Sequence, residues 1–261
     1  MAESVLPKNN QSVNQLNMKI MRKLSVLVCV SLLSISCSAQ WGKTIKGNGN
    51  NITIERNTGD YDGVAVSGWF DVDLVSGSEG EITLEGEENL LEYIITEVKD
   101  GKLVIKTEKG VNLKSSNWKS GIHITIPIES ISSVAMSGSG DIVGKTKIKS
   151  DKFSTAMSGS GDITLDIDTT SLSATMSGSG DITLSGSTTD FEATISGSGD
   201  IEAYDLEADH VSATVSGSAD IQVTANKSIK ARVSGSGDIS YRGNPEKVNT
   251  KTSGSGDISK G

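Results

Sequence analysis

The second half of the chain is dominated by one short phrase, Ser-Gly-Ser-Gly-Asp-Ile. Six identical copies begin at positions 137, 158, 177, 196, 234 and 253, and a seventh at position 216 carries Ala in place of the second Gly. The Asp residues of successive copies are 18 to 21 residues apart. A period this regular indicates a repeat architecture, in which each repeat packs mainly against its two neighbours.

Apolar and polar residues alternate strictly within each copy. From Phe191 to Ala203, every second residue is Phe, Ala, Ile or Gly, and all the residues between them are polar. This period of two indicates extended strands with one apolar face. Aligning the copies gives two apolar columns: Met136, Met157, Met176, Ile195, Val215, Val233 and Thr252, and Ile142, Ile163, Ile182, Ile201, Ile221, Ile239 and Ile258.

These columns are what a solenoid requires, because each coil places its apolar residue on the same residue of the next coil, roughly 4.8 Å away. A coil of about 19 residues has a perimeter of roughly 60 Å, enough for two or three short strands. We therefore predict an all-β fold, a parallel β-solenoid built as a single-stranded β-helix, right-handed by the general preference of parallel crossovers. The alternative is an antiparallel meander with SGSGD hairpin loops, although a hairpin would break the Ser/Gly alternation.

The chain divides into three parts by composition. Residues 1–39 contain an over-extended start and an export signal, residues 40–130 form a less regular β part, and residues 131–261 form the seven-copy solenoid. The signal begins at Met18, with basic residues ahead of an uncharged apolar run from Leu24 to Ile35 that is too short to span a bilayer comfortably.

Two cleavage sites remain open, so the signal covers about residues 18–36 or 18–39. Cleavage before Cys37 would make this cysteine the lipid-attached first residue of a bacterial lipoprotein, although Ser34 stands where such sites usually have Leu. Cleavage after Ala39 would satisfy the small-x-small rule and release a soluble chain. We expect lipid attachment at Cys37, by a small margin.

Composition excludes several classes of function. Residues 1–39 hold four of the 24 Lys and Arg and one of the 33 Asp and Glu, which leaves a mature chain with 20 basic against 32 acidic residues. Such an acidic chain will not seek nucleic acid or anionic lipid through its net charge. Both cysteines lie before residue 40 and only two histidines exist, so we predict no disulfide framework, no metal centre, no cofactor and no catalytic residues.

In a solenoid, the Asp residues of the seven copies would form one outward column. Neighbouring carboxylates ~4.8 Å apart repel by roughly 0.9 kcal/mol per pair in water, so the column needs compensation. We expect it from hydrogen bonds donated by corner amides and Ser hydroxyls. Calcium is a weaker alternative, because one acid per coil is sparse and the glycine-rich nonapeptide of calcium β-rolls is lacking. The predicted ladder residues are Asp141, Asp162, Asp181, Asp200, Asp220, Asp238 and Asp257.

Residues 40–130 show local signals of other kinds. Leu90, Leu91 and Ile94 have helical spacing and predict one or two helical turns, and Asp100-Gly101 predicts a hairpin. We expect a polar loop from 110 to 121 and a strand over 122–126 that Pro127 closes.

The histidines and aromatic residues give weaker expectations. His123 is expected to be a surface strand residue, and His210 to lie in a loop without an obvious partner. Trp69, Phe70 and Trp118 could stack against sugars, but core or end-cap positions are the more common role for such residues.

Several phrases outside the repeat resemble one known family. They are VSGWFDV (66–72), EGEENLL (85–91), TEVKDGKL (96–103) and YRGNP (241–245). With the SGSGD copies they cover about residues 52–261 and resemble the putative auto-transporter adhesin, head GIN domain family of exported Bacteroidetes proteins. The resemblance implies a β-helical exported domain with an adhesin role, although a fold alone does not define a function.

We therefore expect a non-catalytic envelope protein that binds a surface glycan or protein. It would contact a membrane only through an N-terminal lipid, as an outer-membrane lipoprotein, in the periplasm or on the cell surface. A periplasm-facing lipoprotein scaffold or sensor is the main alternative. A polysaccharide-acting β-helix enzyme is less well supported, because Arg232 and Arg242, the two Arg residues of the repeat half, lie in no obvious acidic cluster.

Overall fold

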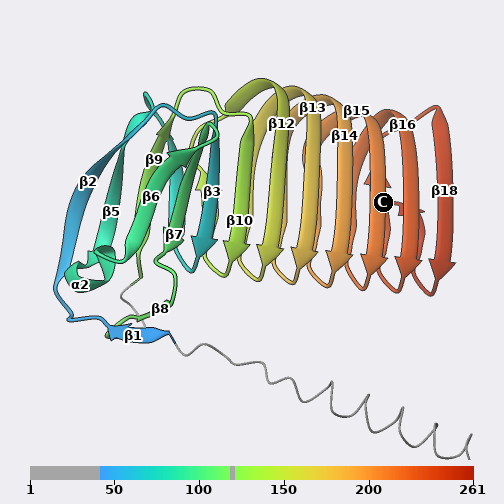
Figure 1. The fold of residues 1–261 in the computed structure, drawn as a ribbon. Helices are drawn as coiled ribbons and strands as arrows, with labels where there is room; N and C mark the ends of the chain where they lie inside the picture. Colours follow the sequence, from blue (N-terminus) through green and yellow to red (C-terminus); the bar gives the residue numbers. More distant parts are fainter. Residues whose placement is uncertain (1–41, 118–120) are drawn as a thin grey trace, which may run out of the picture. The chain divides into compact units, whose positions relative to one another are not determined.

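Parallel strands stacked side by side make up most of the fold (Figure 1). The computed structural model describes residues 42–117 and 121–261. The strands are β1 (Lys43–Lys46), β2 (Asn51–Gly59), β3 (Gly63–Gly68), β4 (Asp71–Ser76), β5 (Gly80–Glu87), β6 (Ile94–Lys99), β7 (Lys102–Thr107), β8 (Val111–Lys114), β9 (His123–Ile128), β10 (Ser133–Gly138), β11 (Ile142–Gly144), β12 (Ile148–Gly159), β13 (Ile163–Gly178), β14 (Ile182–Gly197), β15 (Ile201–Gly217), β16 (Ile221–Gly235), β17 (Ile239–Arg242), β18 (Lys247–Gly254) and β19 (Ile258–Lys260), and a short helix, α2, spans Glu88–Leu91.

The repeats form a parallel β-solenoid, as the sequence predicts. Strands β13 to β16 each run from one SGSGD phrase to the next, and neighbouring strands pair in parallel with equivalent repeat positions in register. Met176 lies beside Ile195, and Ile182 lies beside Ile201. The two columns continue to Thr252 and Ile258 at the last coil. Because every pairing from β10 to β19 is parallel, the antiparallel meander is wrong.

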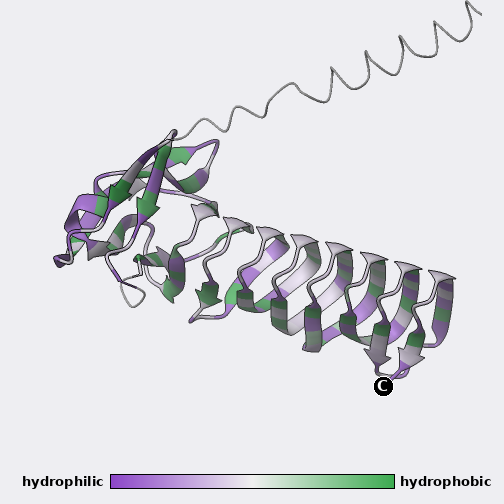
Figure 2. Ribbon diagram, turned by 90° about the horizontal axis from the view of Figure 1, so that it is seen from below, coloured by the Kyte–Doolittle hydropathy of each residue, from purple (hydrophilic) through white to green (hydrophobic). Residues whose placement is uncertain are grey.

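The alternation of the sequence separates the core from the surface. Phe191, Ala193 and Ile195 point inward and are buried, whereas Glu192 between them is exposed. Hydrophobic and hydrophilic bands accordingly follow one another along the strands (Figure 2). Each fully buried large apolar side chain contributes about 1.5–3 kcal/mol. The core is therefore a row of such layers, one per coil.

A coil that precedes the repeats comes from much earlier in the chain. β3 pairs in parallel with β10, and β4 pairs with β11, so Val66 lies beside Met136 and Val72 beside Ile142. The phrase VSGWFDV at 66–72 thus occupies the place of an SGSGDI corner. Residues 77–132 are inserted between this coil and the next.

The inserted segment closes the N-terminal end of the stack. β7 and β9 lie parallel against β3 and β4, whereas β5 and β6 pair in antiparallel fashion with β9 and β7, and β2 pairs with β5. This mixed sheet is the less regular β segment predicted for this end. The predicted hairpin joins β6 to β7, with positive φ at both Asp100 (51°) and Gly101 (76°). The predicted helical turn is α2, four residues long, although Ile94, expected to belong to it, begins β6.

Two local expectations for this end are wrong. Within the expected polar loop, β8 pairs in parallel with β1, since alternate residues there can still form a strand once a partner is present. Pro127 lies inside β9, in register with Val75, and does not end the strand. The glycine- and asparagine-rich stretch 47–52 leads into β2, which begins at Asn51 and runs antiparallel to β5.

Candidate functional site

The ladder of aspartates lines one corner of the solenoid, and its carboxylates accept hydrogen bonds from backbone amides. The N–H of Asp181 donates to Oδ1 of Asp162 at 3.0 Å, and the N–H of Asp200 donates to Oδ1 of Asp181 at 3.0 Å. The same bond recurs from Asp162 to Asp257, at 2.7 to 3.1 Å. These charge-assisted bonds oppose the repulsion between the stacked carboxylates.

The shape of the corner explains why this position is Asp. The flanking amides already have backbone partners in the adjoining coils: Ser179 N–H donates to the carbonyl of Gly159, and Ile182 N–H donates to the carbonyl of Asp200. The Asp N–H between them donates instead to the carboxylate of the previous coil. At the corner, the Asp side chain of one coil therefore accepts the hydrogen bond that a backbone carbonyl accepts elsewhere. The N–H group of the next Asp thus has a partner.

Glycine is required at the first of the two motif positions. Gly178 has a φ of +155°, and a Cβ built there would lie 2.0 Å from the carbonyl oxygen of Gly159. The second position is also tight, since a Cβ on Gly180 would lie 1.8 Å from the oxygen of Gly161. Ala219 nevertheless occupies the second position in one coil and is fully buried, so this position adapts to one methyl group.

The ladder begins one coil earlier than the repeats indicate. Asp71 accepts a bond from the N–H of Asp141 at 3.4 Å and is the first member of the column. The sequence hides it because Trp69 and Phe70 replace the Ser and Gly of the motif. Phe70 is buried and Trp69 packs beside it, with ring centroids 6.0 Å apart. They are core and flanking residues, and the signal that could have found Asp71 was the surrounding phrase VSG-x-x-DV.

The ladder offers little to a metal ion. No group of three or more His, Asp or Glu side chains within residues 42–117 and 121–261 has the geometry to hold one. One carboxylate oxygen of each inner ladder residue is already engaged with an amide, so each coil contributes a single, partly used ligand. The calcium alternative therefore gains no geometric support from the described residues.

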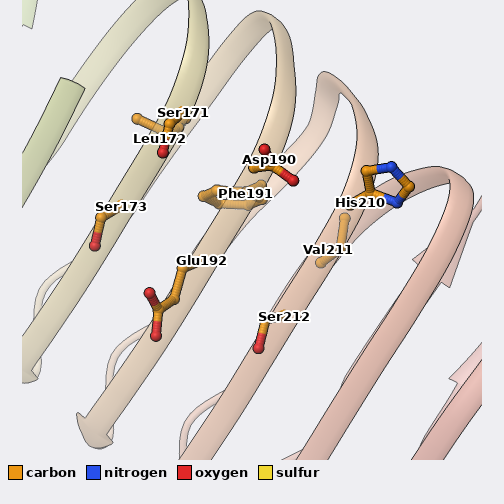
Figure 3. A pocket seen from close by; sticks show the side chains of 9 residues that line it. All are labelled: Ser171, Leu172, Ser173, Asp190, Phe191, Glu192, His210, Val211 and Ser212. Carbon is orange, nitrogen blue, oxygen red and sulfur yellow. The ribbon is translucent and has the colours of Figure 1, made fainter. Parts of the chain in front are cut away.

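A groove of about 290 Å³ crosses three coils on the face formed by β13, β14 and β15 (Figure 3). Leu172, Phe191 and Val211 also line it, although their side chains point inward and are buried. Polar side chains rise along its two sides in register: Ser171, Asp190 and His210 on one, and Ser173, Glu192 and Ser212 on the other. The groove is open and shallow, with hydrogen-bonding groups suited to a flat polar partner.

His210 lies in this groove and not in a loop. It belongs to β15, and its Nδ1 lies 2.8 Å from Oγ of Ser228 in the next coil. Asp190 is its register neighbour on the other side. Among the described residues no hydrogen bond or ion pair joins Asp190 to His210.

A second polar groove, of about 340 Å³, lies where the ladder meets the N-terminal end. It is lined by Asp71, Glu85 and His123, register neighbours on β4, β5 and β9. His123 is a surface strand residue, as expected, and its Nε2 lies 3.4 Å from Oδ2 of Asp73. Lys145 lies 3.4 Å from the other oxygen of that carboxylate. The cluster therefore holds three carboxylates, one Lys and one His, all at least partly exposed.

Glu87 is a buried carboxylate that sequence reasoning did not single out. It accepts hydrogen bonds from the N–H of Gly49 at 2.6 Å and of Ser116 at 2.8 Å, and it is 1% exposed. Burial by itself would raise its pKa, but the hydrogen bonds from Ser116 and Gly49 outweigh that effect and lower the pKa below its ordinary value. A Cβ on Gly47 would collide with this carboxylate. The glycine-rich loop therefore wraps Glu87 and fixes the N-terminal end.

The two Arg residues of the repeats lie apart from any catalytic arrangement. The guanidinium of Arg242 stacks over the ring of Tyr204, 3.8 Å from its centroid. Arg232 lies on a different strand, β16, beside Lys251 of β18. Among the described residues neither Arg forms an ion pair with a carboxylate. Cys37 and Trp118 lie outside the described residues.

Most of the solenoid matches one known family. The model of the putative auto-transporter adhesin, head GIN domain family matches residues 60–245, which include the early coil and most of the stack. The chain belongs to this family. Membership in the head GIN domain family supports a binding role and an exported or cell-surface location.

Solved structures agree with this assignment. A putative adhesin from Bacteroides fragilis is 25% identical, with a TM-score of 0.74 over 83% of this chain and 99% of its own. A putative lipid binding protein from Parabacteroides distasonis is 26% identical, with a TM-score of 0.71 over 84% and 100%. A putative adhesin from Parabacteroides merdae, at 20% identity and a TM-score of 0.66 over 84% and 99%, shares the fold.

No protein of curated function matches the chain. Within the described part of this head GIN domain protein, no helix is long and apolar enough to cross a membrane.

Proposed function

We propose that this head GIN domain protein is a non-catalytic binding protein of the cell envelope that acts as an adhesin at the cell surface. The observation that carries the proposal is the flat face of stacked strands, with shallow open grooves lined by Ser, Thr and single charged side chains. An enzyme instead needs a nucleophile, acid or base held in a fixed mutual arrangement. A regular array spread over many coils suits contact with an extended partner such as a glycan or another protein.

Attachment to the outer membrane through a lipid on Cys37 completes the proposal. A lipid at this residue would tether the solenoid while leaving its faces free. Replacing Cys37 by Ser should abolish incorporation of labelled fatty acid and shift the protein from the membrane fraction to the soluble fraction. A wild-type protein that incorporates no labelled fatty acid and is recovered in the soluble fraction would contradict a lipid anchor and favour cleavage after Ala39.

Protease treatment of intact cells tests the surface location. The protein would be detected with an antibody to residues 40–261, and a known periplasmic protein would be followed as a control. Loss of the protein while the control survives would support adhesion. Protection until the outer membrane is opened would contradict it and favour the periplasm-facing scaffold or sensor.

A direct assay addresses the enzyme alternative. Purified protein would be incubated with pectin and other acidic and neutral polysaccharides, and the products tested for reducing ends and unsaturated sugars. We expect neither product. Release of either would overturn the non-catalytic assignment.

A further inference from the structure

Charge is strongly segregated along the solenoid. Residues 153–225 hold 12 acidic residues and no Lys or Arg, whereas residues 226–261 hold seven basic residues against three acidic ones. The basic residues belong to the last coils, which contain β16 and β18 at the C-terminal end of the stack (Figure 1). A protein with net negative charge thus carries a local cationic end.

One outward column changes its character at this end. In the earlier coils it holds small residues in register, Ala65, Ala135, Ala156, Thr175, Thr194 and Thr214. In the last two coils the same column holds Arg232 and then Lys251, which lie directly beside each other on parallel strands. Both side chains are exposed. The column of small side chains therefore ends in two long cationic side chains.

In the part of the chain that the structure describes, neither of these cations is paired with a carboxylate. Like charges in neighbouring register positions repel each other and are ordinarily avoided. Among the described residues no ion pair and no side-chain hydrogen bond involves Arg232 or Lys251. Lys230, two residues before Arg232 on β16 and exposed on the same face, likewise forms no ion pair and no side-chain hydrogen bond among the described residues. The two adjacent positive charges therefore destabilise the free protein, and an anion bound between them would remove this repulsion.

Both cations line one groove of about 410 Å³. Four hydroxyl groups also line it, those of Thr214, Ser216, Ser234 and Ser253, together with the buried, inward-facing Val215 and Val233. Guanidinium and ammonium groups bind carboxylate or sulfate, and hydroxyl groups exchange hydrogen bonds with sugar hydroxyls. Cationic and hydroxyl groups together match a sugar acid.

We propose that this basic groove binds an acidic polysaccharide, with Arg232 and Lys251 on its carboxylate or sulfate groups. The groove is open to solvent, and it lies on the same flat face as the groove around His210. An anionic membrane surface would also meet the cations, but the hydroxyl-lined walls favour a sugar. The inference rests on the proposed binding function and names its class of ligand.

The test compares two double variants of the purified protein. R232Q/K251Q removes the cations of the groove, and K149Q/K152Q removes two exposed lysines of β12 as a charge-matched control. Binding to polygalacturonate and to heparin would be measured at 50 and 200 mM NaCl, with dextran as a neutral polysaccharide. We expect wild-type binding that weakens with salt, a loss of tenfold or more in R232Q/K251Q, less than a twofold change in the control, and no binding to dextran.

Several results would overturn the proposal. They are absence of wild-type binding to both polyanions, equal binding by R232Q/K251Q, or an equal loss in the control variant. Stronger binding to phosphatidylglycerol vesicles than to either polysaccharide would assign the groove to lipid instead. Circular dichroism must show that both variants fold, as expected for exposed side chains. If protease removes the protein from intact cells while the purified protein fails these binding assays, that pair of results would refute this inference alone and leave the surface role intact.

Discussion

Replacing three consecutive ladder residues tests whether the carboxylates hold the corners together. The variant in which Asp162, Asp181 and Asp200 all become Asn removes three charges and keeps an Oδ1 acceptor beside each following N–H. The corresponding triple Ala variant removes the same charges and the acceptors as well. Both variants relieve the same repulsion. Their difference in the free energy of unfolding therefore isolates three hydrogen bonds, at 2.9 to 3.0 Å in the native protein.

The structure gives the expected size of this difference. A hydrogen bond of this kind contributes about 1 kcal/mol, so the triple Ala variant should be about 3 kcal/mol less stable than the triple Asn variant. For a domain of this length that corresponds to a melting temperature lower by roughly 6–12 °C. Thermal unfolding followed by far-ultraviolet circular dichroism would resolve such a shift easily. Equal melting temperatures for the two variants would refute the role assigned to the ladder.

Salt provides a second readout for the same reasoning. The three substitutions remove four neighbouring carboxylate pairs, each worth roughly 0.9 kcal/mol of repulsion in water before screening. They also weaken three charge-assisted bonds by about 1 kcal/mol each, so the triple Asn variant should lie close to wild type at low salt. Raising NaCl to 1 M shortens the screening length to about 3 Å and should stabilise wild type more than the triple Asn variant. An identical salt response in both proteins would mean that the carboxylates do not repel.

Three further predictions concern the core, the corner and the N-terminal end. Ile182→Asp places an unpaired charge in a fully buried column and should lower stability by about 4 kcal/mol or more, measured by denaturant unfolding. Gly178→Ala forces a methyl group against the Gly159 carbonyl at positive φ and should cost about 2 kcal/mol or more, whereas Ala219→Gly should cost about 1 kcal/mol or less. Because the folded pKa of Glu87 is lowered, its contribution is complete above the ordinary carboxyl pKa of about 4.3 and is lost as the pH falls through the lower folded value. Wild type should therefore lose stability over that acidic range, and Glu87→Gln should flatten this part of the pH profile.

Each of these predictions has an outcome that contradicts it. An unchanged unfolding midpoint for Ile182→Asp would mean that the column does not face the core. Equal costs at Gly178 and Ala219 would show that the two corner positions are equivalent, against the geometry. A Glu87→Gln protein with the same acid dependence as wild type would assign that dependence to other carboxylates.

Parts of the candidate sites can be predicted from the sequence. The repeat spacing placed the seven ladder aspartates on one corner, because positions one coil apart must stack. The same spacing places Arg232 and Lys251, which are 19 residues apart, side by side on neighbouring coils. Only the structure shows that both side chains line one groove and that neither pairs with a carboxylate among the described residues. His210 was assigned to a loop because its local stretch is polar. Its strand conformation comes from the coils on either side, which pair with it on both edges.

The sequence alone determined the coil. A period of two makes strands, a period near 19 stacks them, and glycines at fixed places turn the corners, all of which are local properties repeated seven times. Only the tertiary structure decided how the N-terminal end is built, because β3 and β10 pair across 70 residues and β8 finds its partner in β1. No local pattern specifies such distant pairings. They arise because burying the last open apolar layer favours whichever strands can cover it, and this brings Asp71 and Glu87 into place.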